Sequence, residues 1–184
     1  LALDKDARAR TSIYASGRAI GTAVNAAVQQ GLLANGEIGP GKAELGVLDR
    51  VNATREELRH LSAYQPGRVL EVSRKQQALG LSAGEYRVLG QDRKGRQVEV
   101  ADKRGKRFRF DPAPIRAGKG DQNLTLHEPR KLEIHKGDRI RWTRNDHRRG
   151  LFNADQARVV AVVGGKVTFE TSKGDQVELK KDDP

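Results

Sequence analysis

Short segments with hydrophobic residues at alternate positions, separated by glycine-containing turns, fill residues 66–184 and constrain the fold more than any other feature. Alternation predicts strands, because successive side chains of a strand point to opposite faces of the sheet. Eight strands are expected, at residues 68–73, 85–91, 97–101, 107–110, 138–144, 156–163, 166–171 and 176–180. The sequence therefore predicts small antiparallel sheets.

The eight predicted strands form two sets of four, and the turn glycines recur at a spacing of about 70 residues. The corresponding glycines are Gly67 and Gly137, Gly80 and Gly150, Gly95 and Gly165, and Gly105 and Gly174. On this register Leu70 and Val72 correspond to Ile140 and Trp142, so the inward positions also match. The pattern predicts two copies of a small four- to five-stranded β-barrel of the SH3-like or OB-like kind.

The N-terminal third of the chain has a helical pattern instead. Apolar residues recur every three or four positions, as an amphipathic helix requires, with Asp4 able to cap its start and Gly36 able to end it. The apolar stripe consists of Ile13, Ile20, Val24, Val28 and Leu32. A capping-box pattern at Thr54 and Glu57 predicts a shorter helix that ends near Tyr64.

Together these patterns predict an α+β fold that is mainly β, with an N-terminal helical segment followed by two small barrels in tandem repeat. The expected parts are a helical segment at 1–65, a first barrel at 66–113, a linker at 114–130 and a second barrel at 131–184.

The charge balance indicates a polyanionic partner. Lys and Arg number 35 against 24 Asp and Glu, which gives a formal net charge of +11. The chain has no Cys and only four His, none at metal-ligand spacing, so we expect no metal site. It also has no apolar stretch long enough to span a membrane and no visible signal peptide. Because it begins at Leu1 within a pattern, we expect a fragment of a longer protein.

Two motifs that are typical of enzymes lack the rest of their pattern. Residues 36–42 have the spacing of a phosphate-binding loop, but Ala43 stands where a Mg²⁺-binding hydroxyl is needed. Residues 80–84 match GxSxG, yet they lie between two predicted strands rather than between a strand and a helix. We expect a surface turn at the first motif and no hydrolase at the second.

The most informative basic segment is residues 139–149. Alternation places Arg139 and Arg141 on one face of a strand, which predicts a surface that tracks phosphates; a solvated face is the alternative. Trp142 is interpreted either as core or as a platform on which a base stacks. The candidate nucleic-acid-binding residues are Arg139, Arg141, Trp142, Arg144, Asn145, Arg148 and Arg149, with Lys103, Arg104, Lys106 and Arg107 in a turn of the first copy.

Residues 136–146, 150–154 and 158–163 resemble the helicase part of conjugative relaxases, the plasmid-transfer proteins that nick and unwind DNA. The segments at 3–33, 56–62 and 64–69 resemble that family as well. The resemblance implies an insertion in the second motor domain of a superfamily 1, RecD-like helicase, containing an SH3-like 2B subdomain. It also implies that the ATP-binding loop lies upstream, that later helicase motifs lie downstream, and that the region acts as a type IV secretion translocation signal.

We therefore expect a non-catalytic accessory region of a relaxase-helicase that contacts single-stranded DNA. Its expected partners are that DNA, a type IV secretion coupling protein and the rest of the relaxase-helicase chain; we expect a monomer. No cofactor is expected here, since ATP and Mg²⁺ belong to the parent motor domains. The expected location is the donor-cell cytoplasm, with export to the recipient alongside DNA. Two alternatives stay open: a protein-docking module without DNA binding, and a tandem SH3-like RNA-binding protein.

Overall fold

The computed structural model describes residues 7, 10–115, 123–147 and 149–180. It is mainly β, with helix α2 (Arg18–Ala34), three short 3-10 turns and antiparallel strands. The strands are β1 (Lys42–Arg50), β2 (Val69–Val72), β3 (Gly84–Asp92), β4 (Gln97–Asp102), β5 (Arg107–Phe110), β6 (Leu124–His135), β7 (Arg139–Arg141), β8 (Gln156–Val163), β9 (Lys166–Thr171) and β10 (Gln176–Lys180). All eight strands predicted from alternation are confirmed, and so is the mainly β α+β class.

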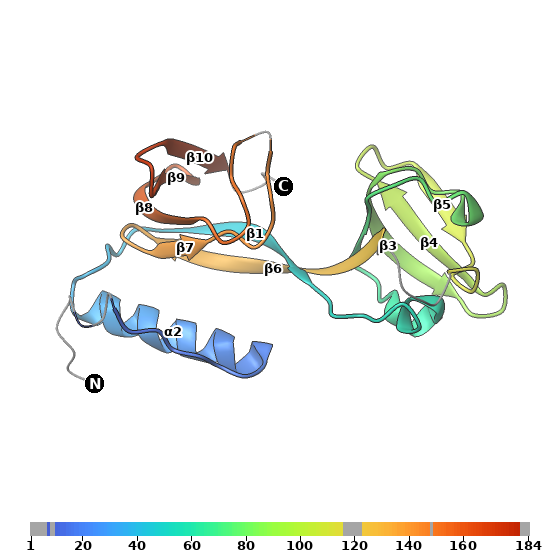
Figure 1. Cartoon of the computed structure of the whole chain (residues 1–184), viewed down its shortest axis with the longest axis horizontal. Helices are drawn as coiled ribbons and strands as arrows, with labels where there is room; N and C mark the ends of the chain where they lie inside the picture. The colour runs from blue at the N-terminus through green and yellow to red at the C-terminus, as the bar shows by residue number, and fades with distance from the viewer. Residues whose placement is uncertain (1–6, 8–9, 116–122, 148, 181–184) are drawn as a thin grey trace. The chain divides into compact units, whose positions relative to one another are not determined.

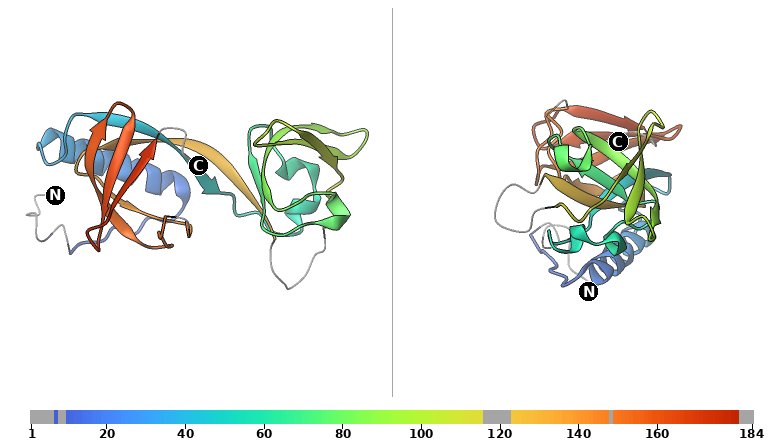
Figure 2. Two further views of the ribbon diagram at one scale, coloured as in Figure 1. Left: turned by 90° about the horizontal axis from the view of Figure 1, so that it is seen from above. Right: turned by 90° about the vertical axis from the view of Figure 1, so that its right-hand side faces the viewer.

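The chain divides into two compact units (Figures 1 and 2). The terminal unit consists of Leu1–Leu45 and Glu133–Asp183, and the central unit consists mainly of Gly46–Leu132. The strand orders are β1-β6-β2-β3-β4-β5 in one sheet and β10-β9-β8-β7 in the other. Whether 66–113 and 131–184 are separable domains stays a prediction.

The two sets of strands share bulges, isolated bridges and backbone hydrogen bonds as well as their strand order. In each set the long second strand carries a bulge, between Val88 and Gly90 in β3 and between Val159 and Ala161 in β8. A bulge sharpens the local bend of a strand, which helps a small sheet to curl around its core. Each set also has an isolated bridge at the corresponding place, Gln76–Leu81 and Asp146–Leu151. A corresponding backbone hydrogen bond precedes the first strand of each set. It runs from Gly67 N–H to the Val88 carbonyl (2.9 Å) and from Gly137 N–H to the Val159 carbonyl (2.8 Å).

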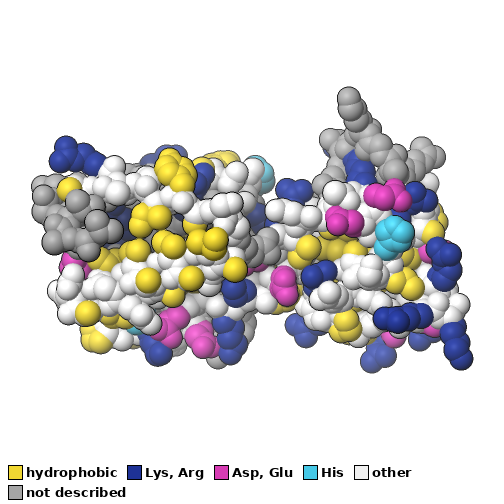
Figure 3. Space-filling view, turned by 90° about the horizontal axis from the view of Figure 1, so that it is seen from below, with side chains coloured by type: hydrophobic (Ala, Val, Ile, Leu, Met, Phe, Trp, Pro, Cys, Tyr) yellow, Lys and Arg dark blue, Asp and Glu magenta, His cyan; other side chains and the backbone are white. Residues whose placement is uncertain are grey.

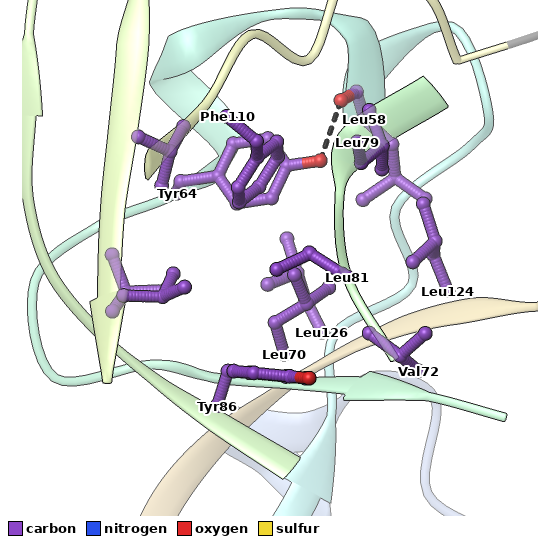
Figure 4. Close-up of a cluster of buried hydrophobic side chains, with 13 residues drawn as sticks. Leu58, Tyr64, Leu70, Val72, Leu79, Leu81, Tyr86, Phe110, Leu124 and Leu126 are labelled. Atoms are coloured by element: carbon purple, nitrogen blue, oxygen red, sulfur yellow. Dashed lines mark hydrogen bonds between the residues drawn. The ribbon is translucent and has the colours of Figure 1, made fainter. Parts of the chain in front are cut away.

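The core of the central unit is a continuous cluster of fully buried side chains (Figure 4). Tyr64 lies within it and packs edge-on against Phe110, with ring centroids 5.5 Å apart. Its hydroxyl donates a hydrogen bond of 2.7 Å to the Leu58 carbonyl, which satisfies both groups away from water. Burial raises the pKa of Tyr64, so the phenol stays protonated and able to donate.

The terminal unit buries the inward positions of β8 and β9, among them Val159, Val167 and Phe169. Helix α2 belongs to this unit and is held by Gln29, whose amide donates to the Glu133 carbonyl (3.2 Å) and to the Asp138 carboxylate (2.7 Å). The helix ends as predicted at Gly36, which adopts φ +67°. There the Gly36 and Glu37 N–H groups donate back to Leu33 and Leu32, the pattern of a glycine-terminated helix.

Both predicted helices needed correction. The first is not continuous: α2 begins at Arg18, because Gly17 has φ +86° and interrupts the helical backbone. Ala7 is also helical, and the predicted cap Asp4 lies outside the described residues. The capping box at Thr54 and Glu57 does form, with the Thr54 N–H donating to the carboxylate at 2.7 Å. It leads into two 3-10 turns, η1 (Glu57–Arg59) and η2 (Leu61–Ala63), because the backbone of the intervening residue is extended.

Two strands lie where the sequence predicted other structure. β1 occupies residues 42–50 of the expected helical segment, and β6 occupies residues 124–135 across much of the expected linker. Pro129 near the middle of β6 weakens the strand pattern, since proline cannot donate to a ladder. The inward leucines Leu124 and Leu126 nevertheless complete the central core.

Replacing Tyr64 with Phe tests the buried hydrogen bond at the centre of this core. The variant should lose about 1–2 kcal/mol of unfolding free energy, because the Leu58 carbonyl is left without its partner. Urea denaturation of the full chain measures the loss. Tyr14→Phe is the matched control, since Tyr14 is 95% exposed and should tolerate the change. Equal effects of the two substitutions would contradict this assignment.

Gly67 and Gly137 provide a second test, because they occupy corresponding positions but have different surroundings. Both have positive φ, +90° and +100°, so alanine at either should cost about 1–2 kcal/mol. A Cβ at Gly137 would also lie 3.2 Å from the Ile38 side chain, whereas a Cβ at Gly67 would have no atom within 4 Å. Gly137→Ala should therefore lower the thermal unfolding midpoint further than Gly67→Ala; the reverse order would show that Ile38 is misplaced.

Candidate nucleic-acid interface

Strand β7 places its arginines as alternation predicts. Arg139 and Arg141 are exposed, whereas Ile140 between them is half-buried. The strand pairs with β8 so that Arg139 lies opposite Arg158 and Arg141 lies opposite Gln156. The structure therefore adds Arg158 to the predicted residues and brings three guanidinium groups onto two neighbouring strands.

Among the residues that the structure describes, these three arginines have no partner that neutralises them. No hydrogen bond or ion pair joins the side chain of Arg139, Arg141 or Arg158 to another residue that the structure describes. Arg158 was not selected from the sequence because it lies among apolar residues of β8. Pairing the two predicted strands in register would have placed it opposite Arg139.

The loop after β7 is organised differently. Arg149 donates to the Asp146 carboxylate at 2.7 Å, and its side chain is only 17% exposed, so its charge is largely neutralised. The Asn145 side-chain oxygen accepts a bond of 2.7 Å from the Asn153 N–H, which closes the loop. Arg144 is exposed, and Arg148 lies outside the described residues. Through these contacts, the side chains of Asn145, Asp146 and Arg149 stabilise the loop.

Trp142 turns toward the interior of the terminal unit. Its ring is half-buried and meets the buried Phe169 edge-on, with centroids 5.6 Å apart. Its backbone bonds to both Ala154 and Asp155, which fixes the position of the strand end. Of the two interpretations of this residue, its packing favours a place in the core.

The basic turn of the central unit is shaped by Asp102, whose carboxylate accepts bonds of 2.9 Å from the Arg104 and Lys106 N–H groups. Most cations of the turn already have partners. Lys103 lies 3.3 Å from Glu85 and Arg107 lies 3.4 Å from Glu99, while Lys106 lies over the Phe108 ring. The Arg104 side chain is exposed.

A second polar cluster joins β1 to β6 in the terminal unit. Lys42 bonds to the Glu133 carboxylate at 2.8 Å, and His135 lies 3.1 Å from the same group. The hydrogen bond from Lys42, followed by that from His135, holds the pKa of Glu133 below its usual value. Because Lys42 and Glu133 form an ion pair between neighbouring strands, we assign this cluster a structural role.

The described residues show no catalytic arrangement at the two enzyme-like motifs. Residues 36–42 connect α2 to β1 rather than a strand to a helix. Ser82 precedes β3, and its carbonyl accepts a bond from Tyr86. The same part of the chain contains no group of three metal-ligating side chains and no helix long and apolar enough to cross a membrane.

Comparison with known proteins identifies one matching family and two similar proteins. Residues 47–134 match the family described as the DNA relaxase TraI 2B/2B-like domain. The chain is 29% identical over 145 residues to the multifunctional conjugation protein TraI of Escherichia coli, and 29% identical over 135 residues to that of E. coli strain K12. The alignments cover 78% and 73% of this chain but 8% and 7% of the relatives.

Residues 47–134, which comprise most of the central unit, therefore belong to the TraI 2B/2B-like domain family. The match of residues 47–134 and the similarity to TraI over 78% of this chain confirm the resemblance to conjugative relaxases seen in the sequence.

Intrinsic fluorescence tests the position of Trp142, because it is the only tryptophan in the chain. If its ring packs on Phe169, saturating oligothymidylate should leave the emission intensity within about a tenth of its starting value, since base stacking would quench a contacting indole. Trp142→Phe should preserve DNA affinity within about twofold. Strong quenching together with loss of affinity would establish the stacking role instead.

Proposed function

We propose that this chain is a non-catalytic accessory region of a conjugative relaxase-helicase and that it contacts single-stranded DNA. The observation that carries the proposal is the group of exposed arginines on β7 and β8, Arg139, Arg141 and Arg158, which have no carboxylate partner among the described residues. Exposed guanidinium groups bind phosphate oxygens without reading sequence. The net charge of +11 and the membership in a DNA relaxase domain family support the same reading.

We further propose that the two sets of strands are duplicated SH3-like barrels. The matching bulges, bridges and turn glycines support this, because unrelated sheets would not share all three at one register. In this proposal the barrels act as a monomeric frame, and ATP, Mg²⁺ and the nicking chemistry belong to other parts of the parent chain.

A docking role toward the secretion machinery is the second candidate, and helix α2 favours it. From Ala19 to Ala34 the helix has no charged residue, although 32% of the chain is charged. Exposed hydrophobic side chains, including Ile20 and Val28, gather along it (Figure 3). In this role the region is a type IV translocation signal that meets a coupling protein in the donor cytoplasm and travels with the DNA.

Titration of labelled oligothymidylate with the full chain at increasing salt tests the proposed function. The affinity should fall steeply, with the logarithm of the binding constant decreasing by about 0.7 per phosphate contact for each tenfold rise in salt. A duplex RNA of the same length is the control and should bind more weakly. Absence of DNA binding at low salt would reject the DNA role.

The docking role has a separate test. Capture of the chain by a purified coupling protein should survive substitution of Arg139 and Arg141 but fail when Ile20→Glu and Val28→Glu place charges on α2. Loss of capture on substitution of the arginines alone would instead assign the partner surface to β7.

A further inference from the structure

A groove crosses the outer face of β7, β8 and β9 in the terminal unit. Its volume is about 630 Å³, and it is open to solvent rather than enclosed. The polar side chains that line it include Lys136, Arg139, Gln156, Arg158, Glu170 and Thr171. Three cations against one carboxylate leave the groove with a local charge of +2.

The cations of the groove include a like-charged pair. Arg139 and Arg158 lie directly opposite one another on adjacent strands, where two charges of the same sign repel. Glu170 is opposite Arg158 on the other side, but no ion pair joins them. A bound anion between the two guanidinium groups would relieve the repulsion, so the pairing indicates a ligand with closely spaced negative charges.

The other side chains of the groove suit phosphate oxygens rather than bases. Gln156 supplies an amide donor, and Thr171 and Ser172 supply hydroxyl donors. No aromatic ring is among the described lining residues, and Trp142 packs inward against Phe169. Donors without a stacking surface bind the nucleic-acid backbone and leave the bases unread.

We infer that this groove binds successive phosphates of single-stranded DNA without contact to the bases. The inference rests on the proposed DNA-binding function and assigns to it Lys136 together with Gln156, Arg158 and Thr171, the last three of which the sequence did not indicate. Arg149 and Asn145 are not assigned to the groove, because Arg149 is engaged by Asp146 and the Asn145 side chain accepts a bond within the loop.

Fluorescence anisotropy with the full chain tests the groove, using oligothymidylate and an abasic strand of the same length. The double variant Arg139→Gln, Arg158→Gln should lose about tenfold in affinity at low salt and about 1.4 in salt slope, for two phosphate contacts. The matched control Lys103→Gln, Arg107→Gln removes the same charge from ion-paired sites and should lose less than about twofold. The abasic strand should bind the unaltered chain within about threefold of oligothymidylate.

Glu170→Gln provides a gain of function that an unfolded variant could not give. Removing the one carboxylate of the groove should raise the affinity for oligothymidylate about two- to threefold. The salt dependence of binding should become only slightly steeper. Thermal unfolding of the groove double variant should show no loss of stability, since the substitution removes a like-charged pair.

Four results would overturn the inference. Equal losses in the groove variant and the control would show that only total charge matters. An abasic strand that binds more than about tenfold more weakly would show that bases are contacted. If the groove variant and the control variant both keep full affinity, the chain binds DNA at another site. If the unaltered chain does not bind DNA, the proposed function is rejected together with the inference.

Discussion

Alternation along short curled strands is the constraint on which the rest of this structure depends. Each strand must bury every second side chain, and in the terminal unit those positions are taken by small or aromatic apolar residues such as Val159 and Phe169. The intervening positions then face solvent whatever their charge. Arg139, Arg141 and Arg158 are outward for this reason, and the surface they form is a direct consequence of how the core is filled.

The two sets of four strands provide different surfaces because their outer residues and neighbours differ. In the central unit the strand that corresponds to β7 is β2, and it is flanked by β6, with Val69 opposite His127. In the four-stranded sheet β7 is the edge. The same register that sets Arg139 against Arg158 sets Val69 against Arg87, so the like-charged pair is specific to the terminal unit.

Strand positions were predictable from the sequence, because alternation and turn glycines are local signals. The long strands β1 and β6 were not predictable. Pro129 interrupts the alternating pattern of β6, and β1 has only Ala43 and Leu45 as buried positions. A local reading also extended the capping box into a helix, although core contacts of Leu58 and Tyr64 favour two short turns. At the candidate site the sequence identified Arg139 and Arg141. It could not identify the groove, which exists only when three strands are placed side by side.

The most direct measurement of the central claim is a map of backbone and arginine side-chain NMR shifts on addition of oligothymidylate to the full chain. The account predicts the largest changes at Lys136, Arg139, Arg158 and Thr171, with little change at Trp142 or in the turn at 103–107. Changes confined to that turn or to the loop at 144–149, with the β7–β9 face unaffected, would contradict it.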